Sequence, residues 1–138
     1  MEKKIKHLEL IQGVVNRLAT NSFQMKGWSV VLIAALLAFL AREGDNMLVP
    51  IGFVPVLCFW GLDGYFLWQE RLFRALYDHV RILDEAKVDF SMDIGRFRKN
   101  SQTDRSLVRT WPRAMLSRTL IGFHGVLAAT IILALVLI

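Results

Sequence analysis

The chain has 138 residues, 54% of them hydrophobic, and its 17 Lys and Arg residues exceed its 12 acidic residues to give a formal net charge of +5. This length and the positive mean hydropathy exclude a pair of soluble domains and indicate one small membrane domain, residues 1–138. The single cysteine, Cys58, excludes a disulfide framework and a cysteine metal site. Motifs for nucleotides, metals and activated nucleophiles are also missing, so we expect no metal, no cofactor and no enzyme activity.

Residues 3–22 are expected to form an amphipathic helix in the cytoplasm. Apolar residues recur there at spacings of three, four and three, as on one face of a helix. These residues are Leu8, Ile11, Val15 and Leu18. The helix should continue into the first membrane span, residues 23–41, whose length of about 28 Å is close to that of a bilayer core. The preceding segment is too long and too acidic for a signal peptide.

The second span, residues 47–68, follows a turn at residues 42–46. Its cytoplasmic continuation, residues 69–86, repeats the apolar spacing of the first segment. The residues on this second stripe are Phe73, Leu76, Val80 and Leu83. We therefore expect the first two spans to form a long antiparallel hairpin whose cytoplasmic ends pack through the two stripes.

Residues 87–111 are expected to form a cytoplasmic loop. Over residues 87–94 apolar and polar residues alternate strictly, which is typical of a half-buried strand. No second segment offers a comparable pattern, so such a strand would need an edge on another chain. The alternative is an extended segment held on the helices by its apolar side chains. The basic residues beyond it, which offer a surface for a partner or for lipid, are Arg96, Arg98, Lys99, Arg105, Arg109 and Arg113.

The third span is expected over residues 112–138. Pro112 suits a first helical turn, and the 20 residues from Thr119 to Ile138 carry no Asp, Glu, Lys or Arg. As a helix they would be about 30 Å long, enough to cross a bilayer core. The fold class is therefore an all-α integral membrane protein with three transmembrane helices.

The distribution of basic residues predicts the orientation. Five of the 17 Lys and Arg residues lie in residues 1–27, eleven lie between residues 71 and 118, and only Arg42 lies between the first two spans. Because basic loops stay in the cytoplasm, the N terminus should be cytoplasmic and the C terminus periplasmic. Trp28, Trp68 and Trp111 all fall at the expected cytoplasmic interface, where indole rings are common.

Two titratable residues, Asp63 and His124, lie inside the second and third spans. Their positions place them about 9 Å and about 7.5 Å below the cytoplasmic surface, at nearly one depth. A charge inside a bilayer is costly unless it is paired or hydrated, so such residues are candidate functional groups. The pair could act as a polar clasp between spans, or Asp63 could pair with Lys26 or Arg118. It could also conduct protons or ions.

Other signals concern assembly and catalysis. Gly61 and Gly64, like small residues at similar spacing in the other spans, would let helices approach closely. A protein of three spans is too small to enclose a pore, so we expect a homo-oligomer, a tetramer or larger. Arg74 and His79 match the R-x4-H spacing of HEPN-type ribonucleases, a spacing that also arises readily on a basic helix.

Two runs of the sequence resemble a known group of proteins. They extend from Lys6-His7-Leu8-Glu9-Leu10-Ile11-Gln12 to Asn21-Ser22-Phe23-Gln24-Met25-Lys26-Gly27-Trp28, and from Phe59-Trp60-Gly61-Leu62-Asp63-Gly64-Tyr65 to Gln69-Glu70-Arg71-Leu72-Phe73-Arg74-Ala75-Leu76-Tyr77. The group consists of small bacterial inner-membrane proteins, some of which resemble membrane components of anti-phage defence loci. The resemblance covers residues 6–81 and implies a bacterial inner membrane and a role in defence. It supplies no catalytic residues.

Three functions follow as hypotheses. The leading one is a non-enzymatic, oligomeric membrane component that receives a cytoplasmic protein partner or signal and anchors it, or perturbs or marks the membrane. The second is a small proton- or ion-conducting protein that uses Asp63 and His124. The third is a membrane-tethered HEPN-like ribonuclease that uses Arg74 and His79. The expected partners are membrane lipids, further copies of the chain and a cytoplasmic protein, and nucleic acid is not expected.

Overall fold

A computed structural model describes residues 1–44, 46–99 and 110–137 of the chain. Within these ranges the structure consists of helices and connecting segments, without a strand. The elements in chain order are α1 (Glu2–Glu43), the 3-10 helix η1 (Asn46–Gly52), α2 (Phe53–Arg81), the 3-10 turn η2 (Glu85–Lys87), α3 (Gly95–Lys99), α4 (Trp111–Met115) and α5 (Arg118–Leu137). The prediction of an all-helical fold is confirmed for these ranges.

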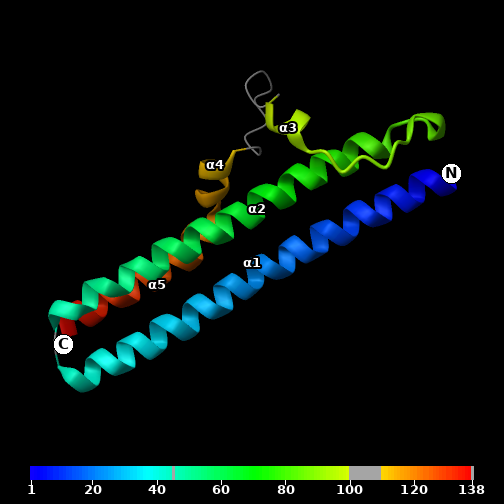
Figure 1. Cartoon of the computed structure of the whole chain (residues 1–138). Coiled ribbons are helices and arrows are strands. Elements are labelled where there is room, and N and C mark those ends of the chain that lie inside the picture. Colours follow the sequence, from blue (N-terminus) through cyan, green and yellow to red (C-terminus); the bar gives the residue numbers. More distant parts are fainter. Residues whose placement is uncertain (45, 100–109, 138) are drawn as a thin grey trace.

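The two longest helices, α1 and α2, lie side by side in opposite directions, and α5 runs back along the first half of α2 (Figure 1). The α1 helix is unbroken over 42 residues, which corresponds to about 63 Å. It ends at Gly44, whose φ of 70° is left-handed and whose N–H donates to the carbonyl of Leu40 at 2.9 Å. The described end of α5 lies near this turn (Figure 1).

Among the described residues, three helical segments are long and apolar enough to cross a membrane, namely Glu2–Glu43, Met47–Arg81 and Arg118–Leu137. Large apolar side chains on them face outward. Val31 and Leu57 are each 61% exposed, and Val126 is 66% exposed. Large apolar side chains exposed in this number are typical of contact with a membrane or another protein.

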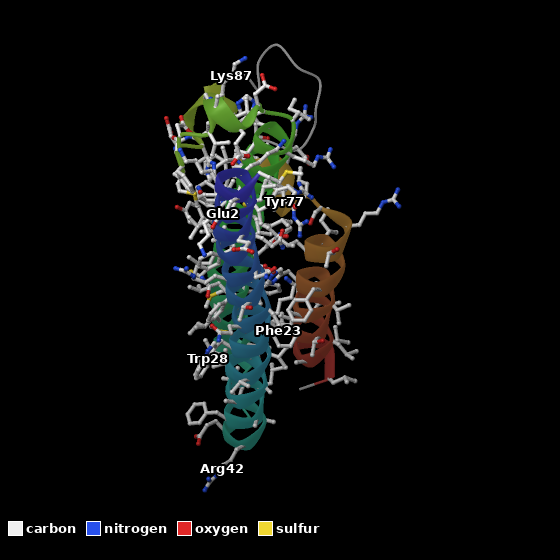
Figure 2. The ribbon with its side chains drawn as sticks, turned by 90° about the vertical axis from the view of Figure 1, so that its right-hand side faces the viewer. Glu2, Phe23, Trp28, Arg42, Tyr77 and Lys87 are labelled. Atoms are coloured by element: carbon white, nitrogen blue, oxygen red, sulfur yellow. The ribbon has the colours of Figure 1, made fainter. Side chains whose placement is uncertain are left out.

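Two clusters of buried apolar residues lie along the α1–α2 pair in the described part of the chain. The first cluster joins α1, η1, α2 and α5 through Ile33, Leu40, Val49, Val56, Leu127 and Ile131. The second cluster joins the far halves of α1 and α2 through Ile11, Val15, Leu76 and Val80, with Leu8, Phe73 and Leu83 packed against it. Leu18 is half-buried and does not belong to it. The second cluster lies toward the end of the molecule that holds Glu2, Tyr77 and Lys87 (Figure 2).

The short strand considered possible over residues 87–94 is not formed. Only the short turn η2 is regular in this part, and the chain then runs on without regular structure. The side chains of Asp89, Ser91 and Asp93 accept hydrogen bonds from backbone N–H groups two residues further on, at 3.0, 3.3 and 2.8 Å. Such local turns use the donors that a strand would present to a neighbour. The polar residues of the alternation therefore prevent the strand.

The same segment lies along the far halves of α1 and α2. Met92 and Ile94 pack against the second cluster. The ring of His7, which is buried, bonds through Nε2 to the Ser91 carbonyl at 3.0 Å. Glu85 accepts hydrogen bonds from the backbone N–H groups of Lys3 at 2.9 Å and Lys4 at 3.4 Å, which have no partner within the first turn of a helix. The alternative, a segment held on the helices by its apolar side chains, is observed for Met92 and Ile94, but the segment is not extended throughout, because Phe90 has a left-handed φ of 56°.

Three of the predicted helices have different bounds in the structure. The second span, predicted over 47–68, begins as the 3-10 helix η1, and α2 begins at Phe53. The cytoplasmic helix was predicted to extend over 69–86, but α2 ends at Arg81. The continuous helix over 112–138 is also wrong, because α4 ends at Met115 and α5 begins at Arg118. Ser117 explains the break, since its hydroxyl accepts a hydrogen bond from the Leu120 N–H at 3.3 Å and caps α5.

Candidate functional site

The carboxylate of Asp63 lies where α1, α2 and α5 meet, and it has no exposed surface. Its Oδ2 atom lies 2.7 Å from Lys26 Nζ and 3.1 Å from His124 Nε2. Its Oδ1 atom accepts a hydrogen bond from Lys26 Nζ at 2.9 Å and another from the hydroxyl of Ser22. These four residues, which come from three helices, form a polar cluster.

The α1 helix supplies two members of the polar cluster from one face. Ser22 and Lys26 are four residues apart, so their side chains are neighbours on a helix, and Lys26 Nζ donates to Ser22 Oγ at 3.0 Å. The Lys26 side chain is 18% exposed. Its aliphatic stem therefore lies along the helix pair while its ammonium group reaches the buried carboxylate.

The α5 helix supplies His124, which is buried between two aromatic rings. The ring of Trp60 stacks on it with centroids 6.0 Å apart and an interplanar angle of 14°. The ring of Phe123 meets it edge-on, with centroids 5.2 Å apart. The contact with Asp63 assigns the proton to Nε2, and within the described part of the chain Nδ1 has no hydrogen-bond partner. The rings and the carboxylate together fix the orientation of the imidazole.

The short helix α4 packs on α2 beside the polar cluster. The indole N–H of Trp60 donates to the Met115 carbonyl at 2.8 Å, and the indole N–H of Trp111 donates to the Gly61 carbonyl at 3.1 Å. A Cβ atom at Gly64 would overlap Met115 Cγ and lie 3.3 Å from Met115 Cα. Gly64 therefore allows α4 to approach, and the Trp60 bond uses a carbonyl that the end of α4 leaves without a helical partner.

The sequence predicted Asp63 and His124 at similar depth, and it offered Lys26 or Arg118 as a partner for the carboxylate. The structure brings Asp63 together with both His124 and Lys26, whereas Arg118 is exposed. The hydroxyl of Ser22 was not anticipated, although its spacing of four from Lys26 is a signal for it.

The basic residues predicted as a partner or lipid surface come from separate elements. Arg96 and Arg98 lie on α3, with Lys99 at its end, and Arg113 is exposed on α4. Arg105 and Arg109 lie outside the described residues. The guanidinium carbon of Arg96 lies 5.2 Å from the centroid of the Phe97 ring, and that of Arg98 lies 5.3 Å from the centroid of the Trp68 ring. Two of these cations therefore stack on aromatic rings.

Arg74 and His79, the residues of the ribonuclease hypothesis, project in different directions. Two side chains that are five positions apart on a helix point about 140° away from each other. Arg74 pairs with Glu70 at 2.8 Å and lines a surface pocket of about 260 Å³ with Gln12, Val15, Tyr77 and Asp78. His79 instead lies edge-on to the ring of Phe97, with centroids 5.9 Å apart. The two side chains do not converge on one binding position.

The polar cluster can act chemically as an ion pair enclosed by hydrogen bonds. A buried charge without partners costs several kcal/mol, and the cost is offset only where the remaining lone pairs and protons find partners. Here the carboxylate has three partners on two other helices. The arrangement can thus fix how α1, α2 and α5 pack, and it offers a titratable pair inside the apolar half of the molecule.

Comparison with known proteins adds no relative. No protein-family model matches this chain, and no curated protein or solved structure is significantly similar to it.

Proposed function

We propose that the chain is a non-enzymatic component of a bacterial inner membrane, with three spans and a cytoplasmic stalk that receives a protein partner or signal. The observation that carries the proposal is the length of α1. It is one helix of 42 residues, or about 63 Å, whereas a bilayer core is about 30 Å thick. Half of it must therefore project from a membrane that it crosses along its axis.

The chemistry of α1 supports a division between membrane and stalk. Its first half exposes charged residues such as Lys3, Lys6 and Arg17, while its second half exposes large apolar residues such as Val31 and Phe39. The second cluster holds the first half on the far part of α2. The stalk is thus the part of the molecule formed by residues 2–22 of α1 and 69–81 of α2 together with the segment packed on them.

The basic residues support a cytoplasmic stalk. Both the first segment and the long connection before α5 are rich in Lys and Arg, and basic segments remain in the cytoplasm during insertion. Trp28 and Trp111, which are 63% and 44% exposed, would then lie at the level of the cytoplasmic headgroups. In this orientation the C terminus is periplasmic.

The polar cluster has a structural role in this proposal. It ties α5 to the α1–α2 pair just inside the membrane, so that the stalk and the spans move as one body. A signal received by the stalk then reaches the membrane through the packing of the spans. The resemblance to membrane components of anti-phage loci makes defence the biological setting of the proposal.

Reporter fusions test the topology. A periplasm-only reporter fused after Ile138 should be active, and the same reporter fused after Lys99 should be silent. A cytoplasm-only reporter should give the reverse pattern at both sites. Activity of the cytoplasmic reporter after Ile138 contradicts the three-span topology. Defence is tested separately: phage should plate less efficiently on cells that express the chain with its neighbouring genes, and unchanged plating contradicts the defence role alone.

Proton conduction is a second candidate, and the contact between Asp63 and His124 favours it. The two titratable groups lie 3.1 Å apart within the candidate spans. Proteoliposomes that contain a pH-sensitive dye would acidify faster with the wild-type chain than with Asp63→Asn or His124→Gln. Equal rates in all three contradict conduction while leaving the anchoring role intact.

A further inference from the structure

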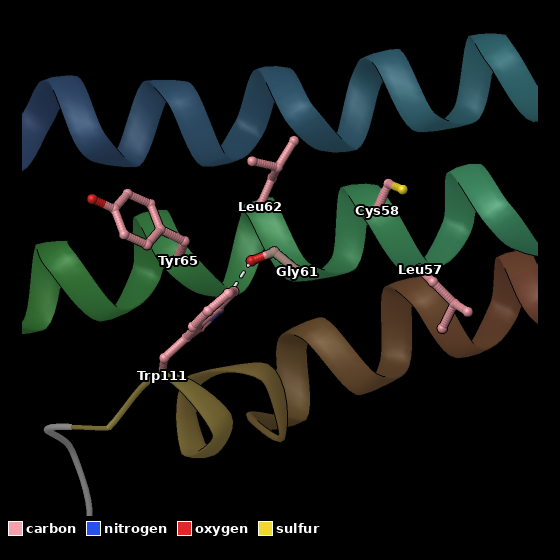
Figure 3. Close-up of a pocket in the computed structure, with 6 residues that line it drawn as sticks. All are labelled: Leu57, Cys58, Gly61, Leu62, Tyr65 and Trp111. Carbon is pink, nitrogen blue, oxygen red and sulfur yellow. Dashed lines mark hydrogen bonds between the residues drawn. The ribbon is translucent and has the colours of Figure 1, made fainter.

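An open apolar groove of about 590 Å³ lies on the surface of α2 beside α4 (Figure 3). Its lining consists of Leu57, Cys58, Gly61, Leu62, Tyr65 and Trp111. The Gly61 carbonyl accepts a hydrogen bond from the Trp111 indole N–H. An apolar occupant of the groove therefore would not leave this backbone oxygen without a donor. The volume lies within the range of about 300–1,000 Å³ that is usual for small-molecule sites.

The two ends of the groove differ in chemistry. Leu57 and Cys58 form one end, and Tyr65 lies eight residues further along α2, which corresponds to about 12 Å. At that second end the ring of Tyr65 lies 6.0 Å from Trp68 and 6.2 Å from Trp111, both edge-on. The guanidinium carbon of Arg98 lies 5.3 Å from the centroid of the Trp68 ring. The groove therefore leads from aliphatic side chains to an aromatic cluster with a cation.

We infer that this groove binds one acyl chain of an anionic glycerophospholipid, with the lipid phosphate at Arg98. The inference rests on the proposed membrane orientation, which places Tyr65, Trp68 and Trp111 at the cytoplasmic headgroup level. A guanidinium carries five N–H donors in a planar fork, and this geometry matches a phosphate. The aliphatic end of the groove then lies among the acyl chains.

Charge complementarity favours a lipid over a second copy of the chain. The formal net charge is +5, and the connection that carries Arg98 is rich in arginine. Another copy would bring a second cationic surface toward the same end of the groove, and like charges repel. An anionic lipid brings the opposite charge to Arg98 and an apolar chain to the groove.

Photo-crosslinking in nanodiscs tests the acyl-chain site. The full chain is placed in phosphatidylcholine nanodiscs with a small fraction of phosphatidylglycerol that carries a photoreactive acyl chain, and the label on peptides of residues 57–65 is measured. Gly61→Phe fills the groove, and Gly122→Phe is the matched control, because an added Cβ has no atom within 4 Å at either glycine. Labelling should fall about tenfold for Gly61→Phe, the change expected when the burial of about two methylene groups is lost. It should stay unchanged for Gly122→Phe.

The headgroup is tested with a second pair of variants. The preference for the phosphatidylglycerol probe over a phosphatidylcholine probe should fall by about tenfold in Arg98→Gln, as for the loss of one charge-assisted contact. Arg96→Gln removes the same charge from the same helix and should keep the preference. Arg98 does not line the groove, so the headgroup test remains valid even if Gly61→Phe fails to fold.

Four outcomes overturn the inference or the proposed function on which it rests. Equal labelling of Gly61→Phe and Gly122→Phe would mean that the label reports ordinary surrounding lipid. A disulfide between the Cys58 residues of two copies, together with no lipid label, would mean that another copy covers the groove. Loss of the chain from membranes after an alkaline wash would contradict the proposed function itself. A chain that stays in the membrane but gives no label in the groove contradicts the lipid site alone.

Discussion

Asp63 is the residue whose substitution should disturb the largest number of helices, because its carboxylate contacts two helices besides its own. It holds Lys26 and Ser22 of α1 and His124 of α5 at once. Removal of Asp63 leaves a lysine and a histidine without their acceptor, and removal of Lys26 leaves a fully buried carboxylate without its cation. Either single change is therefore more costly than the loss of both charges together.

We predict that Asp63→Ala lowers the free energy of unfolding by about 3–5 kcal/mol, the usual cost of breaking a buried ion pair. The double variant Asp63→Ala/Lys26→Met should recover part of this loss, because it leaves no uncompensated charge. Asp78→Ala is the control, since that carboxylate is 69% exposed on the same helix. Chemical unfolding in mild detergent measures these three variants and Lys26→Met alone, which completes the double-mutant cycle. If the double variant is as unstable as the sum of its single variants, Asp63 and Lys26 are not coupled.

Gly64 gives a second residue-scale prediction. A methyl group there meets Met115, whereas at Gly61, one turn away on α2, it has no atom within 4 Å. Gly64→Ala should therefore lower the free energy of unfolding by about 1–3 kcal/mol through overpacking. Gly61→Ala should be neutral or should stabilise by about 0.5–1 kcal/mol through helix propensity. Equal melting temperatures for the two variants would mean that α4 moves aside without cost.

The residues of the polar cluster show how far sequence reasoning reaches at this scale. Counting residues from the expected interface gives the depth of a side chain, and this places Asp63 and His124 at one level. It does not give the rotation of one helix against another, which depends on packing between helices. The contact of Ser22 with Asp63 and the stacking of Trp60 on His124 were therefore not predicted from the sequence and are known only from the structure.

Among the elements, the far halves of α1 and α2 depend on apolar packing. Leu76 is fully buried in the second cluster, and Ile82, just after the same helix, is 76% exposed. Leu76→Asp should lower the free energy of unfolding by about 3 kcal/mol, because it places a charge without a partner in an apolar contact. Ile82→Asp should change it by less than about 0.5 kcal/mol. Thermal unfolding in detergent measures both, and equal values would mean that the two helices do not pack there in solution.

The elements also show where a periodic pattern misleads. The three-four-three spacing of apolar residues predicted the contact of α1 with α2, because that pattern depends only on one buried face. The alternation over 87–94 predicted a strand, but Asp89, Ser91 and Asp93 are residues whose side chains bond to the backbone nearby. The break before α5 has the same cause, since Ser117 caps a helix more readily than it continues one. In both places side-chain identity outweighs hydropathy.

The whole molecule leaves most of its apolar helices uncovered. In the most apolar stretches of the three candidate spans, only 17%, 28% and 22% of the residues are buried. Lipid covers such a surface in a monomer, but small residues on it allow closer contacts between helices. Ala34 and Ala38 are exposed on one side of α1, and Gly125 is exposed on α5. Faces of this kind pack closely against other helices in lipid.

We therefore predict that copies of the chain associate through these faces into a closed homo-oligomer, a tetramer or larger. In a closed ring every copy has the same face covered by a neighbour, whereas an open array would leave uncovered faces at its two ends. Ala34→Phe/Ala38→Phe should reduce the assembly to smaller species, since two bulky rings separate the helices. Ala35→Phe is the control, at an exposed small residue about 100° around the same helix from Ala34. Native mass spectrometry in mild detergent and in lipid nanodiscs gives the number of copies. A wild-type chain that is monomeric in both media would contradict assembly, and the stalk would then present its surface to a partner one copy at a time.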